Sequence, residues 1–265
     1  MGERRVEYMS AVGALLWVAA GTRPDLTYTV SLLARFCSNP GQAHYAALMR
    51  TLGYLSRTKA QVLVLRPDAT KEIVVYSDAS WLTRNSVSGG LILFWDSLVS
   101  WWSRLQKSVS ASTCEAEMYA AALASREGVY VRDFAEIDLE LGPSKPTPLM
   151  LDSKSALDLA SDPVAFKKTK HILRHAYELR DRVLRGIYAP QFVDTENQLA
   201  DVLTKGLRVA QHREHLGRLL HEPAAKSPTV PENAQPKGLA RGGGRTSLPD
   251  KAGCSDMARS GNGDG

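Results

Sequence analysis

The chain has 265 residues, of which 44% are hydrophobic and 23% charged, the balance of a globular protein with a sizeable core. A formal net charge of +5 and a sequence pI near 9.1 favour an anionic partner, with nucleic acid as the first candidate. Three scattered cysteines form neither a disulfide framework nor a metal cluster, which indicates a reducing compartment. The apolar run AVGALLWVAAG is too short to span a bilayer, and no signal-peptide cleavage pattern accompanies it.

Residues 8–67 are predicted to be mostly helical. The stretch from Tyr8 to Ala20 forms one apolar patch. Pro24 followed by Asp25 is typical of a helix start, where proline fits the first turn and an acid opposes the helix dipole. A proline-glycine pair then breaks the chain, and HYAALMRTLGYLSRT repeats apolar residues at helical spacing. We expect a small helical segment over residues 1–69.

Residues 70–207 alternate between strand and helix patterns. EIVVYSD is a run of β-forming residues at strand length that ends in an acid, and two later apolar runs joined by Asp96-Ser97 predict a hairpin. The predicted elements are strands at 72–78, 91–95 and 98–102, helices at 111–128 and 131–141, a strand at 148–152, helices at 155–160 and 170–185, a strand at 188–193 and a helix at 196–205. This order predicts an α/β fold, a mixed five-stranded sheet flanked by helices.

The character of the chain changes after this region. Pro, Gly, Ser, Lys and Arg dominate, and large apolar residues nearly vanish beyond about His221. Such a segment buries too little surface to offset the entropy lost on ordering. We therefore expect residues 208–265 to form a C-terminal tail that is mostly disordered from about residue 222.

Four acids fall at corresponding places in the predicted sheet. Asp78 and Asp152 each end a strand, and parallel neighbouring strands would bring them together at the edge where α/β proteins build their sites. Glu117 and Asp201 would face them from helices. An aspartate at a strand end is also an ordinary turn residue, so it is the set of four that carries the functional hypothesis. Clustered carboxylates need a cation, and hard oxygen ligands suit Mg²⁺ or Mn²⁺ and two-metal phosphoryl transfer.

The motifs around these acids carry a family resemblance. YSDASW, SVSGG, VSWWSRLQKSVSASTCEAEMYAA, LDSKSAL, KKTKHI and ENQLADVLTKGL closely resemble, in order and spacing, the ribonuclease H domain of copia-type retrotransposon polyproteins. The resemblance covers residues 70–207 and implies a ribonuclease H-like fold and cleavage of the RNA strand of RNA/DNA hybrids. It also implies two Mg²⁺ ions, with Mn²⁺ as an alternative. The catalytic and metal-binding residues that it implies are Asp78, Glu117, Asp152 and Asp201.

The glutamate of this set has a neighbour that competes for its role. Glu115 stands two residues before Glu117, at the predicted start of the helix. The pattern EMYAA, a glutamate followed by two bulky residues and two alanines, favours Glu117 as the site residue. Glu115 instead suits the first helical turn, where the helix dipole favours an acid.

Several polar residues are candidates for binding the substrate. A basic cluster enters a predicted helix, and in this family setting it favours sequence-independent, salt-sensitive phosphate contacts over a merely solvated face. Gln106 and Ser153 are weaker candidates for contacts with the sugar edges of the hybrid, against ordinary turn roles. The basic candidates are Lys168, Lys170, His171 and Arg174.

The N-terminal block has a resemblance of its own. YMSAVGALLWVAAGTRPDLTYTVSLLARF and HYAALMRTLGYLSRT are similar to the end of the copia-type reverse transcriptase, just before its ribonuclease H. Residues 1–69 are therefore interpreted as a remnant of its thumb or connection region, and the chain as a C-terminal fragment of such a Pol polyprotein. The Tyr-x-Asp-Asp turn of the polymerase occurs nowhere here, so no polymerase activity is expected.

Two hypotheses from different classes follow. The first is a metal-dependent endoribonuclease acting on RNA/DNA hybrids in reverse transcription, with the rest of a reverse transcriptase as a further partner and no membrane or small-molecule cofactor. The alternative is a catalytically silent nucleic-acid-binding remnant, whose N-terminal helices would expose an apolar face. The presence of all four acids favours the first, and the match to ribonuclease H throughout disfavours a recombinase-type nuclease. The expected location is the cytoplasm, the nucleus or retrotransposon particles, without secretion.

Overall fold

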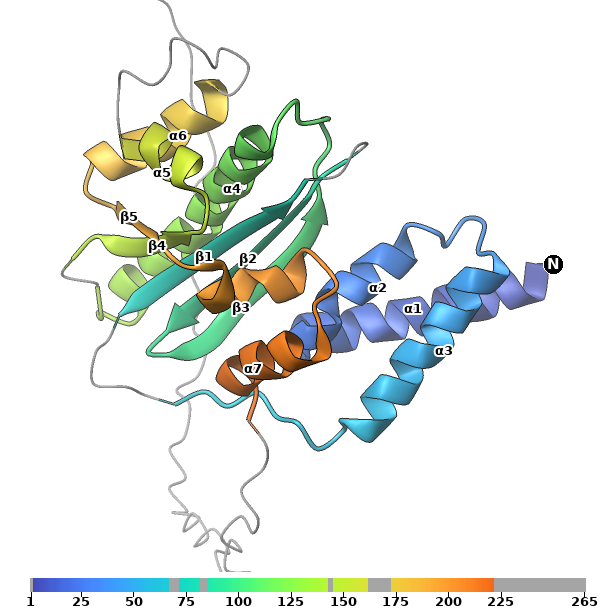
Figure 1. The fold of residues 1–265 in the computed structure, drawn as a ribbon. Coiled ribbons are helices and arrows are strands. Elements are labelled where there is room, and N and C mark those ends of the chain that lie inside the picture. Colours follow the sequence, from blue (N-terminus) through green and yellow to red (C-terminus); the bar gives the residue numbers. More distant parts are fainter. Residues whose placement is uncertain (1, 67–71, 82–84, 143–144, 162–172, 222–265) are drawn as a thin grey trace, which may run out of the picture. The chain divides into compact units, whose positions relative to one another are not determined.

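A computed structural model describes residues 2–66, 72–81, 85–142, 145–161 and 173–221 (Figure 1). Within these residues the first compact unit, Met1–Ala225, contains a mixed sheet and a set of N-terminal helices. None of the described helices has the length and apolar character needed to cross a membrane.

The sheet has five strands in the order β3-β2-β1-β4-β5. The strands are β1 (Ile73–Ser80), β2 (Val87–Phe94), β3 (Ser97–Leu105), β4 (Thr147–Leu151) and β5 (Tyr188–Phe192). The first three form an antiparallel meander, while β4 pairs parallel to β1 and β5 parallel to β4. The predicted mixed five-stranded sheet is confirmed.

Both faces of the sheet are covered, which explains why β1 reads as a nearly continuous apolar run. Val75 faces the core beneath α4 (Thr113–Asp133), α5 (Lys154–Ser161) and α6 (Leu173–Leu184). Tyr76, the next residue, faces a second core that includes the 3₁₀ helix η5 (Leu199–Leu203). Alternate side chains of the strand therefore anchor opposite layers.

The helices differ from the predicted ones in two places. We expected two helices across 111–128 and 131–141, but α4 runs unbroken to Asp133 and continues into a π-helical turn at Phe134–Asp138. The predicted helix at 196–205 is instead two short 3₁₀ helices, η4 (Thr195–Asn197) and η5. Gly128 stands at the expected break but lies inside α4, where a Cβ would clash with the Tyr188 hydroxyl and come within 2.9 Å of Val75, so this glycine allows close packing and does not end the helix.

The N-terminal helices form a small core of their own. They are α1 (Gly2–Gly21), η1 (Pro24–Leu26), α2 (Thr27–Ala34) and α3 (Gln42–Arg57). Tyr8 is fully buried in this core and donates a 2.9 Å hydrogen bond to the Leu33 carbonyl. Arg23 and Asp25 form a buried ion pair at 2.6 Å, and Arg23 also contacts Thr58, which ties η1 to the end of α3.

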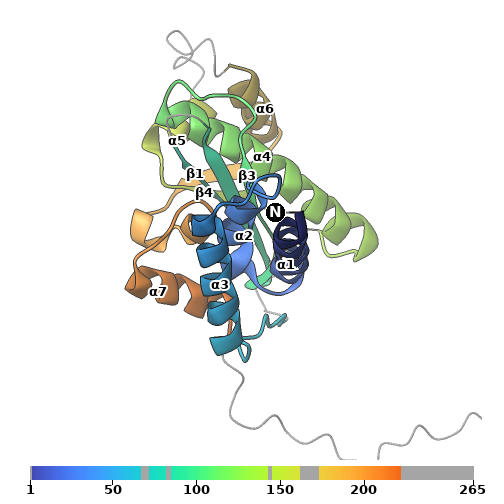
Figure 2. The ribbon, with the colours of Figure 1, turned by 90° about the vertical axis from the view of Figure 1, so that its right-hand side faces the viewer.

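This helical segment packs against the sheet. The Trp101 indole on β3 donates a 2.8 Å hydrogen bond to the Ala19 carbonyl at the end of α1. Ser31 on α2 donates a 3.1 Å hydrogen bond to the Ser103 carbonyl, also on β3. The opposite side of α1 is exposed, and Trp17 on it is 81% accessible. In Figure 2, α1, α2 and α3 lie on the side of the molecule that faces the viewer.

The composition of the chain predicts a tail from residue 208 onward, but the structure has a helix there. The helix α7 (Val209–Leu219) buries Leu216 and Leu219. His221 then pairs with Val62 in an antiparallel bridge. Few residues of α7 are apolar, and composition alone therefore places this segment with the tail.

Candidate metal centre

Asp78 and Asp152 lie side by side because their strands are parallel neighbours. In the register of β1 and β4, Val75 faces Leu149 and Tyr76 faces Met150. The same offset two residues further on places Asp78 opposite Asp152, where β4 has just ended. This is the juxtaposition that the strand pattern predicted.

Asp201 reaches the same edge from η5, which packs against β2. Gln198 begins this helix and donates a 2.9 Å hydrogen bond to the Ser77 carbonyl, next to Asp78. A Cβ on Gly89 would come within 2.5 Å of the Thr204 side chain and 2.8 Å of Leu203 Cβ. The absence of a side chain at Gly89 is therefore what allows η5 to approach the sheet.

The three aspartates form a compact set of oxygen ligands. One carboxylate oxygen from each of Asp78, Asp152 and Asp201 lies within 4.8 Å of the others. Asp78 and Asp201 are 1% and 0% exposed, and Asp152 is half-buried. Among the described residues, no hydrogen-bond donor reaches the buried Asp201 Oδ2. An orphaned anionic oxygen in a buried acidic set fits a hard divalent cation.

Glu117, rather than Glu115, faces this set from α4. Its carboxylate accepts a hydrogen bond from the Ala79 backbone, and its pKa is raised well above the usual range by burial, Asp78 and Asp152. Glu115 is occupied at the helix start, where its Oε2 accepts a 2.6 Å hydrogen bond from the Ala111 N–H. Its own N–H donates to Ser112 Oγ, so the two residues cap α4.

The electrostatics of the site show how strongly the carboxylates repel one another. Burial and the neighbouring Asp78 raise the pKa of Asp201 to about 7, although Lys205 opposes this shift. Burial and Asp78 also raise the pKa of Asp152. Without a divalent cation the site therefore holds protons that an isolated carboxyl would release, and a bound cation would displace them.

Two residues of the LTKGL motif contact the aspartates and were missed by the sequence analysis. Thr204 donates a short hydrogen bond to Asp78 Oδ2. Lys205 Nζ lies 2.9 Å from Asp201 Oδ1. Burial lowers the pKa of Lys205, but Asp78 and Asp201 outweigh that effect and raise it, so Lys205 stays charged. Their spacing, three and four residues after Asp201, was the sequence signal that could have identified them as neighbours of that acid.

The structure does not bring Gln106 to the surface. Its side chain is 1% exposed, and Nε2 donates to Ser88 Oγ and to the Ala116 carbonyl, each at 2.9 Å. Its Oε1 accepts a hydrogen bond from Ser110. Gln106 therefore joins β2, the following loop and α4, and its side-chain polar atoms already have partners within the protein.

The remaining predicted binding residues have different positions. Ser153 is half-buried beside Asp152, and its Oγ accepts a 3.3 Å hydrogen bond from the Ala156 N–H in the first turn of α5. Arg174 is exposed on α6. The other three predicted basic residues lie outside the described residues: Lys168, Lys170 and His171.

Known proteins resemble most of the chain, although no family model matches it. The Pol polyprotein of transposon TNT 1-94 from Nicotiana tabacum is 34% identical over 206 residues, 76% of this chain and 15% of the relative. That of transposon RE2 from Arabidopsis thaliana is 35% identical over 210 residues, 77% of this chain and 14% of the relative. The secreted RxLR effector protein 161 of Plasmopara viticola is 39% identical over 132 residues, 48% of this chain and 93% of that protein.

Solved structures to which the chain shows a weak similarity include ribonuclease H domains. The N-terminal ribonuclease H domain of a Mycobacterium tuberculosis protein has a TM-score of 0.39 at 12% identity, over 55% of this chain and 96% of that one. A foamy viral protease-reverse transcriptase in complex with an RNA/DNA hybrid has a TM-score of 0.47 at 11% identity, over 77% of this chain and 26% of that one.

The mixed sheet, its flanking helices and the acids at one end define an α/β domain with a cluster of carboxylates at the carboxyl ends of two parallel strands. Similarity to known sequences assigns the chain to a narrower class. The chain belongs to the family of retrovirus-related Pol polyproteins from copia-type transposons. It spans about one seventh of the length of these relatives.

Proposed function

We propose that the protein is a divalent-metal-dependent ribonuclease H, which cleaves the RNA strand of RNA/DNA hybrids in retrotransposon reverse transcription. The observation that carries the proposal is the convergence of Asp78, Asp152 and Asp201 within 4.8 Å at the edge of a ribonuclease H-like sheet. Glu117 stands beside them with a raised pKa. No nucleotide polymerisation is proposed, because the Tyr-x-Asp-Asp sequence of the polymerase is absent from the 265 residues.

The residues present fit a pair of hard cations. The clustered Asp78, Asp152 and Asp201, with Glu117 beside them, would supply the oxygen ligands that Mg²⁺ or Mn²⁺ prefers. The buried Asp201 Oδ2 has no hydrogen-bond donor among the described residues. When bound, such ions supply an activated water and charge stabilisation for the leaving oxygen of a phosphodiester.

The protein's own contribution is to hold the carboxylates in place before the cation arrives. The strands β1 and β4 fix Asp78 and Asp152, and Thr204 orients Asp78 by its hydrogen bond. Lys205 lies against Asp201 and keeps the acidic cluster partly neutralised in the cation-free protein. This preorganisation lowers the reorganisation needed when substrate and metal bind.

Cleavage of a labelled RNA/DNA hybrid tests the proposal. The wild-type protein should cut the RNA strand with Mg²⁺ and not with EDTA, and Asp152→Asn should lower the rate by at least about a hundredfold, because a ligand charge is lost. The matched control is Asp158→Asn on α5, an exposed aspartate outside the cluster, which should cleave like wild type.

The opposite results would replace the proposal by the alternative. Salt-sensitive binding of the hybrid without any cutting would identify a catalytically silent nucleic-acid-binding protein. Cutting that survives both EDTA and Asp152→Asn would show that the carboxylate cluster is not the catalytic site.

A further inference from the structure

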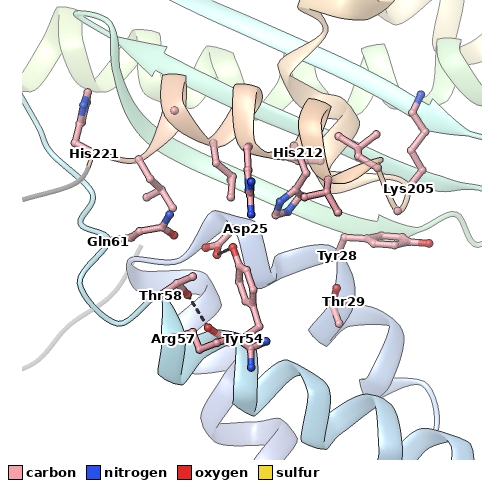
Figure 3. A pocket seen from close by; sticks show the side chains of 18 residues that line it. Asp25, Tyr28, Thr29, Tyr54, Arg57, Thr58, Gln61, Lys205, His212 and His221 are labelled. Atoms are coloured by element: carbon pink, nitrogen blue, oxygen red, sulfur yellow. Dashed lines mark hydrogen bonds between the residues drawn. The ribbon is translucent and has the colours of Figure 1, made fainter.

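A groove with a volume of about 950 Å³ lies between the N-terminal helices and the C-terminal end of the described chain (Figure 3). One wall comes from η1 and the end of α3, and the other from α7 and the loop that precedes it. Figure 3 shows Lys205 and His221 at opposite sides of this groove, with Asp25 and Tyr54 between them.

The groove is basic. Arg57 and Arg213 line it from facing walls, both are exposed, and within the part of the chain that the structure describes neither forms an ion pair. Asp25 is the acid among the described lining residues, and its charge is already balanced, because Arg23 Nη2 lies 2.6 Å from Asp25 Oδ2. Tyr54 also donates a 2.8 Å hydrogen bond to Asp25.

The groove and the candidate metal centre share one residue. Lys205 is part of its lining and at the same time contacts Asp201 at 2.9 Å. One end of the groove is therefore separated from Asp201 by the Lys205 side chain. His212 stands opposite Tyr54 in the groove, and burial lowers its pKa, so it adds a neutral ring rather than a further charge near neutral pH.

We propose that this groove binds the phosphate backbone of a nucleic-acid strand that extends beyond the candidate metal centre. Exposed arginines without ion-pair partners supply sequence-independent phosphate contacts, and they do so on a surface that leads away from the acids. The inference rests on the proposed ribonuclease H function and adds to it a second binding surface. The N-terminal helices and α7 form this surface together. Nucleic-acid binding would therefore involve segments on both sides of the domain boundary expected near residue 69.

The test compares binding of a fluorescent RNA/DNA hybrid of about one helical turn with one of about three turns. EDTA is present throughout, so that no cleavage occurs. The variants are Arg57→Glu and Arg213→Glu, on opposite walls of the groove. Arg185→Glu, an exposed arginine at the end of α6 that does not line the groove, is the matched charge control.

The wild-type protein should bind the long hybrid more tightly than the short one. Each groove variant should weaken binding of the long hybrid about tenfold, with a smaller loss on the short one. Each should also lower the slope of log affinity against log salt by about one. Arg185→Glu should bind both hybrids like wild type. Arg57→Gln, which removes the charge without reversing it, should give an intermediate loss.

The proposal is overturned if the groove variants bind the long hybrid like wild type, or if they lose the same factor on both lengths. Its outcome is separate from that of the proposed function. A protein that fails to cleave but binds as described would retain the groove and lose the nuclease. A protein that cleaves while Arg57→Glu and Arg213→Glu bind normally would retain the nuclease and lose the groove.

Discussion

At the scale of single residues, the candidate centre combines strong mutual repulsion with internal neutralisation. Asp78 and Asp201 are buried almost completely, and among the described residues the cationic side chain in contact with Asp201 is Lys205. Lysine carries one charge, which does not balance four carboxyl groups. Burial, together with this unbalanced repulsion, raises the pKa values of Asp201, Asp152 and Glu117, so that protons complete the neutralisation.

The stability of the cation-free protein should therefore depend on pH in a defined direction. The pKa of Asp201 is raised from 3.8 to about 7, mainly by burial and Asp78. Between these values the folded state holds more protons than the unfolded state, so the free energy of unfolding should fall as pH rises through this window. Because Mg²⁺ favours the ionised carboxylates, the increase in melting temperature that it causes should be larger at pH 8 than at pH 6.

Thermal melting with EDTA or Mg²⁺ at both pH values measures this effect. Asp201→Asn removes the titrating group, so it should flatten the fall in stability of the cation-free protein. An equal Mg²⁺ shift at both pH values, or an unchanged pH profile in Asp201→Asn, would contradict the assignment.

At the scale of elements, the position of η5 depends on contacts made far away in the sequence. The element that carries Asp201 is a five-residue 3₁₀ helix, too short to hold its place alone. Gln198 anchors its beginning to β1, and Gly89 on β2 lets its last residues pack closely. In the strand register Gly89 is also the residue that faces Asp78, so one glycine shapes the surroundings of two acids.

Gly89→Ala should therefore displace η5 and disturb the candidate metal centre. The new Cβ would meet Thr204 and Leu203 at less than 3 Å, and such overpacking costs about 1–3 kcal/mol. Denaturant unfolding should show that loss of stability. The rate of hybrid cleavage should also fall by more than the smaller folded fraction explains, because Asp201 moves. Gly13→Ala on α1, where a Cβ meets nothing within 4 Å, should instead be neutral or stabilising by up to about 1 kcal/mol. Full activity in Gly89→Ala would show that η5 tolerates the shift.

At the scale of the whole described unit, contacts join the N-terminal helices to the sheet. Trp101 and Ser31 make hydrogen bonds between the helices and β3, and the Val62–His221 bridge connects the segment after α3 with the end of α7. Because these contacts cross the boundary expected near residue 69, we predict one cooperative unfolding transition rather than two.

Circular dichroism and tryptophan fluorescence should give coincident denaturation curves. Trp101→Phe removes the hydrogen bond to the Ala19 carbonyl and should lower the free energy of unfolding by about 1 kcal/mol without separating the curves. Val99→Ala, an exposed position on the same strand, serves as a control for generic changes to β3. Two separate transitions in the wild-type protein would show that the helices and the sheet fold independently.

Much of the fold was accessible from the sequence because its signals are local. The strands β1 and β4 are runs of β-forming residues that end in acids, and the hairpin of β2 and β3 has a short turn at Asp96. Their parallel pairing followed from the alternation with helices and predicted that Asp78 and Asp152 meet. The 3₁₀ character of η5 and the existence of α7 did not follow, since both depend on packing against distant segments.

The sequence by itself determined the family, the sheet and the identity of four candidate acids, because strand patterns and motif spacing are properties of neighbouring residues. The tertiary structure decided which polar groups surround those acids. Thr204 and Lys205 reach Asp78 and Asp201, whereas Gln106 is buried with its polar atoms occupied. It also created the basic groove between α3 and α7, whose walls are more than 140 residues apart in the chain. Long-range packing, which no local pattern encodes, produced that surface.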